Sequence, residues 1–275
     1  MRKELKVKLK RKLRINKNYP WLKFAMVIVI GFFAYVGAKG MVLGRSGEMV
    51  VVPQTPMKFQ VAVPQKRFRG RLVGKKLVAL TFDDGPSAIT TPQLLDILRD
   101  KDAVATFFEL GNMVRRNPAI VQRVIREGNE LGSHTNSHQN LIKITRANLE
   151  ADKAEADATF LEVIGRTPLI TRPPYGNFNQ AVMDVLGTPV ILWSIDTRDW
   201  ESKDPVKIKE IAIDKAEDGA ILLFHDIYQT TIDSIPDIID TLREKGFEFV
   251  TVSELAEERG IELKKGEYYY KIVAE

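Results

Sequence analysis

Two adjacent carboxylates, Asp83 and Asp84, end an apolar run that begins at Leu77, and Gly85-Pro86 follows them. The run has the length and composition of a buried strand, and the Gly-Pro pair predicts a turn. Side chains alternate between the two faces of a strand, so one of the carboxylates must be re-aimed where the strand ends. Neighbouring carboxylates repel and need a cation or a shared proton. The pair is therefore a candidate metal and acid–base centre, whereas a surface turn is the simpler alternative.

The chain has three histidines, and two of them, His134 and His138, are four residues apart. This spacing lets both imidazoles reach one cation from the same side of a helical turn. Two histidines and one carboxylate form a familiar catalytic zinc set that leaves one position open. Together with Asp84, the two histidines predict a site for one divalent metal ion. Zinc is the expected metal, although cobalt and nickel suit the same donors.

The third histidine, His225, follows another apolar run, residues 220–224. A histidine in such a place is often a hydrogen-bonded structural residue. A nearby carboxylate such as Asp199 would instead orient the imidazole and raise its pKa, so that it donates a proton at neutral pH. Arg172 precedes two prolines and is either a plain salt-bridge partner or a rigid clamp for a carboxylate such as Asp83.

The strands and helices that position these polar residues are predicted from a regular alternation of apolar runs and helical patterns, which begins at Lys76. Predicted strands cover residues 77–82, 105–110, 130–133, 169–172, 190–195, 220–224 and 247–252. Predicted helices cover residues 91–101, 113–127, 145–164, 178–186, 205–217, 231–245 and 253–259. The alternation predicts an α/β fold with parallel strands and outer helices. About seven βα units are too few for a full eight-unit barrel, so we expect a distorted (β/α) barrel.

In parallel α/β folds, ligands bind at the carboxyl ends of the strands. The carboxylates, the histidines and Arg172 all lie at or just after predicted strand ends, so we expect them on one rim. Tyr175 and Trp200 lie close to these groups in sequence. They are packing aromatics, or, at the rim of an open site, side chains against which sugars stack.

Five segments, in this order, resemble the motifs of the NodB-type polysaccharide deacetylases, carbohydrate esterase family 4. The resemblance covers about residues 75–258, and no implied catalytic position departs from the family pattern. It implies a NodB-like deacetylase fold, a distorted barrel with fewer than eight units. The matching segments are Thr81-Phe-Asp-Asp-Gly-Pro86, His134-Thr-Asn-Ser-His138, Arg172-Pro-Pro-Tyr175, Asp196-Thr-Arg-Asp-Trp200 and Leu223-Phe-His225.

The resemblance implies roles for the general base, for its arginine partner and for the metal ligands. Asp83 is the implied general base, and Arg172 holds it. Asp84, His134 and His138 are the implied ligands of the divalent metal. The implied reaction is metal-assisted hydrolysis of an N-acetyl group on an amino sugar.

The remaining implied roles concern the substrate and the proton donor. His225 is the implied general acid, oriented by Asp199. Leu223 lines the implied acetyl pocket, and the backbone N–H of Tyr175 helps to bind the oxyanion. Trp200 is expected beside the bound sugar.

The amino terminus is strongly basic: its first 23 residues contain ten Lys or Arg and one Glu, although the net charge of the whole chain is only +5. We expect residues 1–23 to stay in the cytoplasm. Residues 24–43 are expected to form a transmembrane anchor, with a cleaved signal peptide as the alternative. Residues 44–76 are then a linker, residues 77–260 the deacetylase domain and residues 261–275 a tail with a small edge strand.

The expected location suggests the substrate. A catalytic domain that is membrane-anchored with its body outside the cell, or secreted after cleavage, and that has no cysteine suggests a Gram-positive-like envelope. Peptidoglycan N-acetylglucosamine is then the expected substrate. A chitooligosaccharide or exopolysaccharide deacetylase is the alternative, and a non-catalytic glycan-binding wall module is a further one. A basic head on a mildly acidic body does not indicate nucleic-acid binding.

Overall fold

The computed structural model describes residues 41–43, 49–51, 72 and 74–273, and the chain divides into two units, Met1–Met57 and Lys58–Glu275. In the first unit, strands β1 (Met41–Leu43) and β2 (Met49–Val51) form an antiparallel pair. The predicted basic head, and all but the last three residues of the predicted membrane segment, lie outside the described residues. Within the described ranges, no helix is both long and apolar enough to cross a bilayer.

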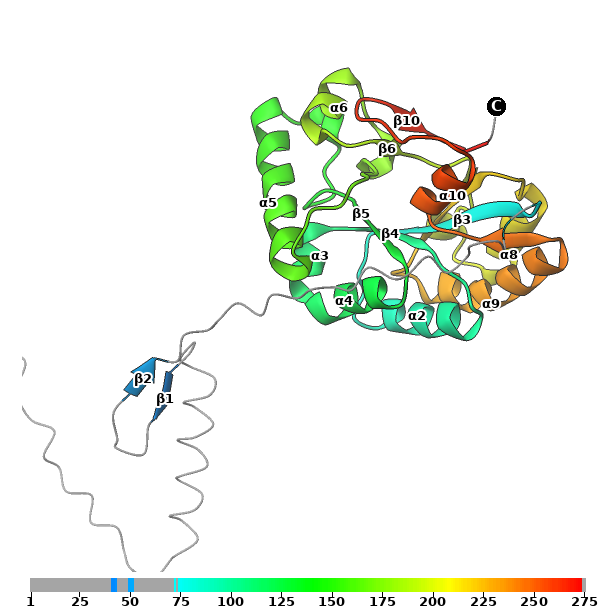
Figure 1. Ribbon diagram of the computed structural model, residues 1–275, viewed down its shortest axis with the longest axis horizontal. Coiled ribbons are helices and arrows are strands. Elements are labelled where there is room, and N and C mark those ends of the chain that lie inside the picture. Colours follow the sequence, from blue (N-terminus) through cyan, green and yellow to red (C-terminus); the bar gives the residue numbers. More distant parts are fainter. Residues whose placement is uncertain (1–40, 44–48, 52–71, 73, 274–275) are drawn as a thin grey trace, which may run out of the picture. The chain divides into compact units, whose positions relative to one another are not determined.

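The second unit is built on a parallel sheet in the order β5-β4-β3-β8-β7, and β9 pairs with the beginning of β3 (Figure 1). The longest strand, β3, is central, and its neighbours β4 and β8 flank the carboxylate end. The strands are β3 (Lys76–Asp83), β4 (Thr106–Glu109), β5 (Glu130–Ser133), β7 (Ile195–Asp196), β8 (Ala220–His225) and β9 (Phe247–Phe249).

The other side of the barrel consists of two-residue strands and single β-bridges. Thr171 forms single parallel bridges to Ser133 and to Val190 in β6 (Val190–Ile191), and β6 pairs in parallel with β10 (Tyr268–Tyr269). Lys271 then bridges to Ala220 at the start of β8. The C-terminal tail therefore lies between β6 and β8 and closes the barrel, which is more than the edge strand expected from the sequence.

Two predicted strands differ from the observed ones. The predicted strand 169–172 is reduced to the bridge at Thr171. The predicted strand 190–195 is split into β6 and β7 because the chain changes partner there. The Leu192 N–H donates to the Tyr269 carbonyl at 2.8 Å, whereas the Ser194 N–H donates to the Ile221 carbonyl at 3.0 Å.

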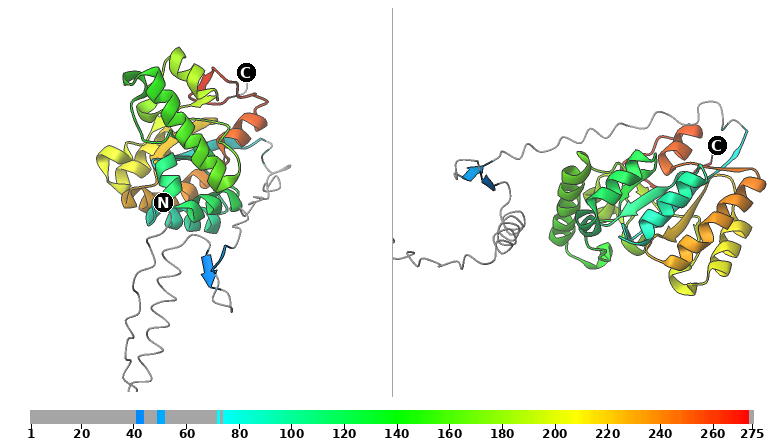
Figure 2. Two further views of the ribbon diagram at one scale, coloured as in Figure 1. Left: turned by 90° about the vertical axis from the view of Figure 1, so that its left-hand side faces the viewer. Right: turned by 90° about the horizontal axis from the view of Figure 1, so that it is seen from below.

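Helices surround the strands, with α5 and α6 on one side of the barrel and α8 and α9 on the other (Figures 1 and 2). The predicted helix 113–127 is two helices, because Pro118 begins the second one. A short helix, α7, was not predicted. The α-helices are α2 (Thr90–Asp100), α3 (Gly111–Arg116), α4 (Pro118–Arg126), α5 (Arg146–Ile164), α6 (Gln180–Leu186), α7 (Asp199–Ser202), α8 (Pro205–Lys215), α9 (Gln229–Glu244) and α10 (Val252–Glu258), and the 3-10 turns are η1 (Leu141–Lys143) and η2 (Pro174–Gly176).

Strand β3 is buried on both faces, and its two faces pack into different cores. Val78, Leu80 and Phe82 pack in the layer between the strands and the helices, where Phe82 stacks on Phe107 and Phe224. Burial of one such phenylalanine side chain stabilises the fold by about 1.5–3 kcal/mol. The alternate residues face the second core, and this alternation carries Asp83 to the inner face at the end of the strand.

Candidate active site

The two adjacent carboxylates point in different directions. Asp83 is the last residue of β3, and its side chain is buried on the inner face. Asp84 has a left-handed backbone with φ 75°, which re-aims its carboxylate away from the strand pattern. The next residue must be small, because a Cβ atom at Gly85 would overlap with the Asp226 carboxylate. One of the two carboxylates is thus re-aimed, as the sequence predicted.

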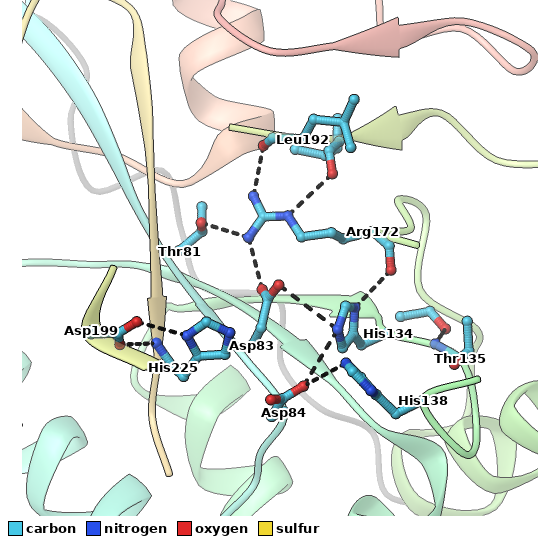
Figure 3. A network of polar contacts seen from close by, with 12 residues as sticks. Thr81, Asp83, Asp84, His134, Thr135, His138, Arg172, Leu192, Asp199 and His225 are labelled. Carbon is cyan, nitrogen blue, oxygen red and sulfur yellow. Dashed lines mark hydrogen bonds and ion pairs between the residues drawn. The ribbon is translucent and has the colours of Figure 1, made fainter. Parts of the chain in front are cut away.

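Arg172 fixes the orientation of Asp83 (Figure 3). Its guanidinium is fully buried, and Nη1 donates to Asp83 Oδ1 at 2.7 Å and to Thr81 Oγ1 at 2.8 Å. The other guanidinium nitrogens donate to the carbonyls of Ile191 and Leu192 at 3.1 and 2.8 Å. Burial lowers the pKa of Arg172, and the Asp83 carboxylate opposes that shift. The geometry is a buried clamp that leaves Asp83 Oδ2 directed toward His134, 3.8 Å from Nε2.

Asp84, His134 and His138 converge on one point. Asp84 Oδ1 lies 3.5 Å from His134 Nε2 and 3.2 Å from His138 Nε2. Burial raises the pKa of Asp84, but the imidazoles of His134, His225 and His138 outweigh burial and bring its pKa below the ordinary value. Burial and the neighbouring His134 lower the pKa of His138, which favours the neutral imidazole. An ionised carboxylate and neutral imidazoles are the forms that bind metal.

The same three side chains fit a small divalent cation. Ligand atoms about 2.0–2.1 Å from a tetrahedral zinc lie about 3.3 Å from one another, close to the two distances observed here. All three donor atoms lie within 4.8 Å of one another. His134 Nδ1 faces the Arg172 carbonyl at 2.7 Å, so this nitrogen carries the proton and Nε2 is left to bind. Within the described residues, the buried Asp84 Oδ1 has no hydrogen-bond partner, as expected of a ligand atom.

On the opposite wall, His225 is held by Asp199. The Asp199 carboxylate is fully buried, and its Oδ1 lies 2.8 Å from His225 Nδ1. Its Oδ2 accepts hydrogen bonds from the His225 N–H and from Thr231 Oγ1, each at 2.7 Å. Burial lowers the pKa of His225, but Asp199, followed by Asp83 and Asp84, raises it to about 9. His225 is therefore protonated at neutral pH, with Nε2 available to donate.

The carboxylates of Asp83 and Asp84 and the three histidines line one cleft of about 430 Å³. Arg172 and Asp199 do not line this cleft, but they contact Asp83 and His225, which do. Tyr175, Trp200 and Leu223 line it too, so the structure brings together every candidate residue named from the sequence. Tyr175 as a residue is 62% exposed, and its ring makes a T-shaped contact with His138, with ring centroids 4.7 Å apart. The backbone of Tyr175 is left-handed, with φ 62°.

Two residues that line the cleft, Trp193 and Tyr228, lie outside the motifs found in the sequence, and a third, Asp196, lies in the fourth motif but was given no role. Their positions contained a usable signal, because Trp193 and Asp196 lie at the end of an apolar strand pattern and Tyr228 is three residues after His225. The Tyr228 and His225 rings lie 5.9 Å apart.

Two further acids, Glu109 and Asp226, are buried near Asp83 and Asp84, and no sequence motif gave either of them a role. Glu109 ends β4 with neither carboxylate oxygen hydrogen-bonded inside the described part of the chain. Burial, with the nearby charges of Asp226, Asp83 and Asp84, raises its pKa well above the usual range. Burial also raises the pKa of Asp226 to about 7, although its Oδ2 accepts a hydrogen bond from Thr91.

Comparisons with known proteins agree with this architecture. Residues 71–188 match the family model described as polysaccharide deacetylase. A Bacillus cereus peptidoglycan-N-acetylglucosamine deacetylase is 39% identical over 189 residues, which cover 66% of this chain and 88% of that protein. The chain belongs to the polysaccharide deacetylase family.

Other relatives of this polysaccharide deacetylase extend the comparison. The peptidoglycan-N-acetylglucosamine deacetylase PgdA of Listeria monocytogenes is 39% identical over 195 residues, which cover 71% of this chain and 41% of PgdA. The chain thus spans about two fifths of the length of that relative. A solved structure described as T48 deacetylase with substrate superposes with a TM-score of 0.69 at 36% identity, covering 72% of this chain and 98% of that one. The expected α/β, NodB-like deacetylase fold is confirmed.

Proposed function

We propose that this polysaccharide deacetylase is a metal-dependent hydrolase that removes N-acetyl groups from the N-acetylglucosamine residues of peptidoglycan. The observation that carries the proposal is the arrangement of the cleft. A metal-ligating set, Asp84 with His134 and His138, lies beside a clamped carboxylate on one wall, and a protonated imidazole lies on the opposite wall. The names of the relatives from Bacillus cereus and Listeria monocytogenes support the choice of peptidoglycan.

The metal bound by Asp84, His134 and His138, for which we propose zinc, would polarise the acetamide carbonyl and make water more acidic. Asp83 is placed to take the proton of the attacking water, because Arg172 occupies only Oδ1 and Oδ2 faces the cleft. The water oxygen bonds to the acetyl carbon, and we assign the Tyr175 N–H as a donor to the resulting oxyanion. Leu223 lines the cleft, and we assign its side chain to the pocket for the acetyl methyl group.

His225 completes the reaction on the other side. Its Nδ1 is occupied by Asp199, so Nε2 gives its proton to the sugar nitrogen as the carbon–nitrogen bond breaks. The products are acetate and a free amine, which becomes an ammonium group at neutral pH. Binding a glycan without reaction would not require a clamped base and a protonated imidazole, and this argues against a non-catalytic wall module.

Acetate release tests this function. The full chain, supplied separately with zinc, cobalt or nickel, is incubated with purified peptidoglycan and with chitooligosaccharides, and acetate is measured. We expect release from peptidoglycan, with mass spectrometry of the digested glycan locating the lost acetyl group on N-acetylglucosamine. Release from chitooligosaccharides alone would favour the alternative substrate class. Glycan binding without acetate release under any metal would overturn the enzymatic proposal.

The location of the enzyme is part of the proposal. We propose that residues 24–43 anchor the chain in the cell membrane, with residues 1–23 in the cytoplasm and residues 77–260 outside. The support is the basic head before an apolar stretch. Fractionation followed by protease treatment of intact cells tests it: the deacetylase domain should be in the membrane fraction and accessible from outside. Full-length protein in the soluble fraction would contradict an anchor.

A further inference from the structure

Three aromatic side chains outside the cleft form a continuous row, which we call the tail aromatic surface: Phe178, Tyr268 and Tyr270. The rings of Phe178 and Tyr268 have centroids 5.1 Å apart, and those of Tyr268 and Tyr270 are 5.7 Å apart in an edge-to-face arrangement. The two tyrosines remain 51% and 50% exposed despite these contacts. Contiguous exposed apolar patches on protein surfaces often serve as interaction sites.

The backbone explains why two tyrosines face outward and the one between them does not. Tyr268 and Tyr269 are paired with β6, and successive residues of a strand alternate between its faces. The Tyr269 ring packs against the inner core, and its hydroxyl donates to Glu267 and to the Glu262 carbonyl. Tyr269 therefore stabilises the fold. The two outward-facing tyrosines contact each other and, through Tyr268, Phe178, but about half of each remains exposed.

Short chain segments and one backbone hydrogen bond connect the tail aromatic surface to two residues that line the cleft. Phe178 is three residues after Tyr175, so their Cα atoms are at most about 11 Å apart. At the other end, Tyr270 follows Tyr269, whose carbonyl accepts a hydrogen bond from Leu192, the residue before Trp193. Tyr175 and Trp193 both line the cleft. These two walls also pack on each other, because a Cβ atom at Gly176 would lie 2.9 Å from the Trp193 ring.

The small volume of the cleft indicates that a polymeric ligand would extend beyond it, toward the tail aromatic surface. A cleft of about 430 Å³ has the volume of a small-molecule site and encloses only a short piece of a polymer. A longer glycan must leave the cleft across its rim. Sugar rings have apolar faces of C–H groups and stack on aromatic rings, and tyrosine offers a rigid ring with a polar edge for such contacts.

We propose that the tail aromatic surface binds the glycan strand beyond the sugar that is deacetylated. This inference depends on the proposed function, because it takes a polymeric glycan as the ligand. Tyr268 and Tyr270 would hold neighbouring sugars by stacking and raise the affinity for long strands without contacting the reacting acetyl group.

The experiment compares long and short substrates. The full-length Tyr268→Ala/Tyr270→Ala variant is assayed on peptidoglycan strands and on an N-acetylglucosamine trisaccharide. We expect kcat/KM on the strands to fall about tenfold, mostly through KM, because each stacked ring contributes a few-fold to binding. The trisaccharide value should not change. The Tyr268→Phe/Tyr270→Phe variant should restore most of the loss, and Leu161→Ala, which truncates an exposed apolar residue on α5, is the matched control.

A second readout does not require activity. Wild type and the double alanine variant are mixed with insoluble peptidoglycan, and the fraction that sediments with it is measured. Weaker sedimentation of the variant supports the inference even if no acetate is released by wild type, in which case only the proposed function fails. Equal loss on long and short substrates, or unchanged sedimentation and KM on strands, overturns the inference.

Discussion

Asp83 and Asp84 are neighbours in the chain, but their carboxylates have different partners. Asp83 Oδ1 accepts a hydrogen bond from the buried Arg172, 2.7 Å away, whereas Asp84 Oδ1 lies 3.2 Å from His138 Nε2. The left-handed backbone at Asp84 produces this separation. Each carboxylate therefore has its own partners, the Arg172 guanidinium for Asp83 and the two imidazoles for Asp84.

The division between the two carboxylates can be tested by Asp83→Asn. Loss of the general base is expected to reduce acetate release by about 10²–10⁴-fold. Bound metal, measured by elemental analysis of the purified protein, should stay near one equivalent because Asp84, His134 and His138 are intact. His134→Ala is the matched variant, and it should lose both the metal and the activity. Normal acetate release by Asp83→Asn would show that another group is the base.

The pH dependence reports on His225. Asp199 raises the pKa of His225 to about 9, so the protonated form is fully present below the ordinary pKa of about 6.5 and is lost as pH rises through 9. The alkaline limb of kcat/KM should therefore fall near pH 9. Asp199→Asn should move that limb to lower pH by at least about one unit, because it removes the largest of the carboxylate effects that raise the pKa of His225 against burial. An unchanged alkaline limb in Asp199→Asn would assign the limb to another group.

Removal of the metal should affect both activity and stability. Chelation is expected to abolish acetate release, and added zinc should restore it. The metal binds the folded state, so the melting temperature should fall on chelation and recover with zinc. His138→Ala is the control, because its melting temperature should no longer respond to zinc. A chelated wild type with full activity would contradict the metal site.

The buried Glu109 should make stability depend on pH. Its pKa in the folded protein is raised, so folding favours the neutral acid, and this preference costs stability as pH rises above the ordinary pKa. Glu109→Gln should therefore be more stable than wild type at pH 8 and should differ little at pH 4. Between pH 4 and pH 8, the difference in the free energy of unfolding between Glu109→Gln and wild type rises by at most about 1.4 kcal/mol per pH unit. Urea unfolding at several pH values measures it, and a pH-independent difference would contradict this assignment.

Closure of the barrel by the tail can be tested at Gly219. This glycine has φ 80°, and a Cβ atom there would overlap with the Ile272 carbonyl. Gly246 has a similar φ of 86° and open space around it, so Gly246→Ala measures the backbone strain alone, about 1–2 kcal/mol. Gly219→Ala should lower the free energy of unfolding by about 1–3 kcal/mol more, because the tail must shift. Equal losses in urea unfolding would show that the tail contact is weak.

The sequence predicted the barrel and the convergence of the site because both depend on local patterns. Apolar runs marked the strands, and Asp83, His134 and His225 were recognisable as polar residues at strand ends. The interruption between β6 and β7 was not predictable, because Leu192 and Ser194 change partners through backbone hydrogen bonds that their side chains do not signal. The burial of Glu109 was missed for a related reason: an acid in a strand reads as exposed unless its surroundings are known.

The closing strand also affects when the site becomes complete. The Tyr269 carbonyl holds Leu192, the Leu192 carbonyl holds Arg172, and Arg172 holds Asp83. Residues 267–272 leave the ribosome after all the residues they support. During synthesis the metal-ligating side chains are present more than a hundred residues before the strand that secures the clamp on the base. The three metal-ligating residues are therefore synthesised early. The orientation of Asp83 is secured only after residues 267–272 have been added and have paired with β6.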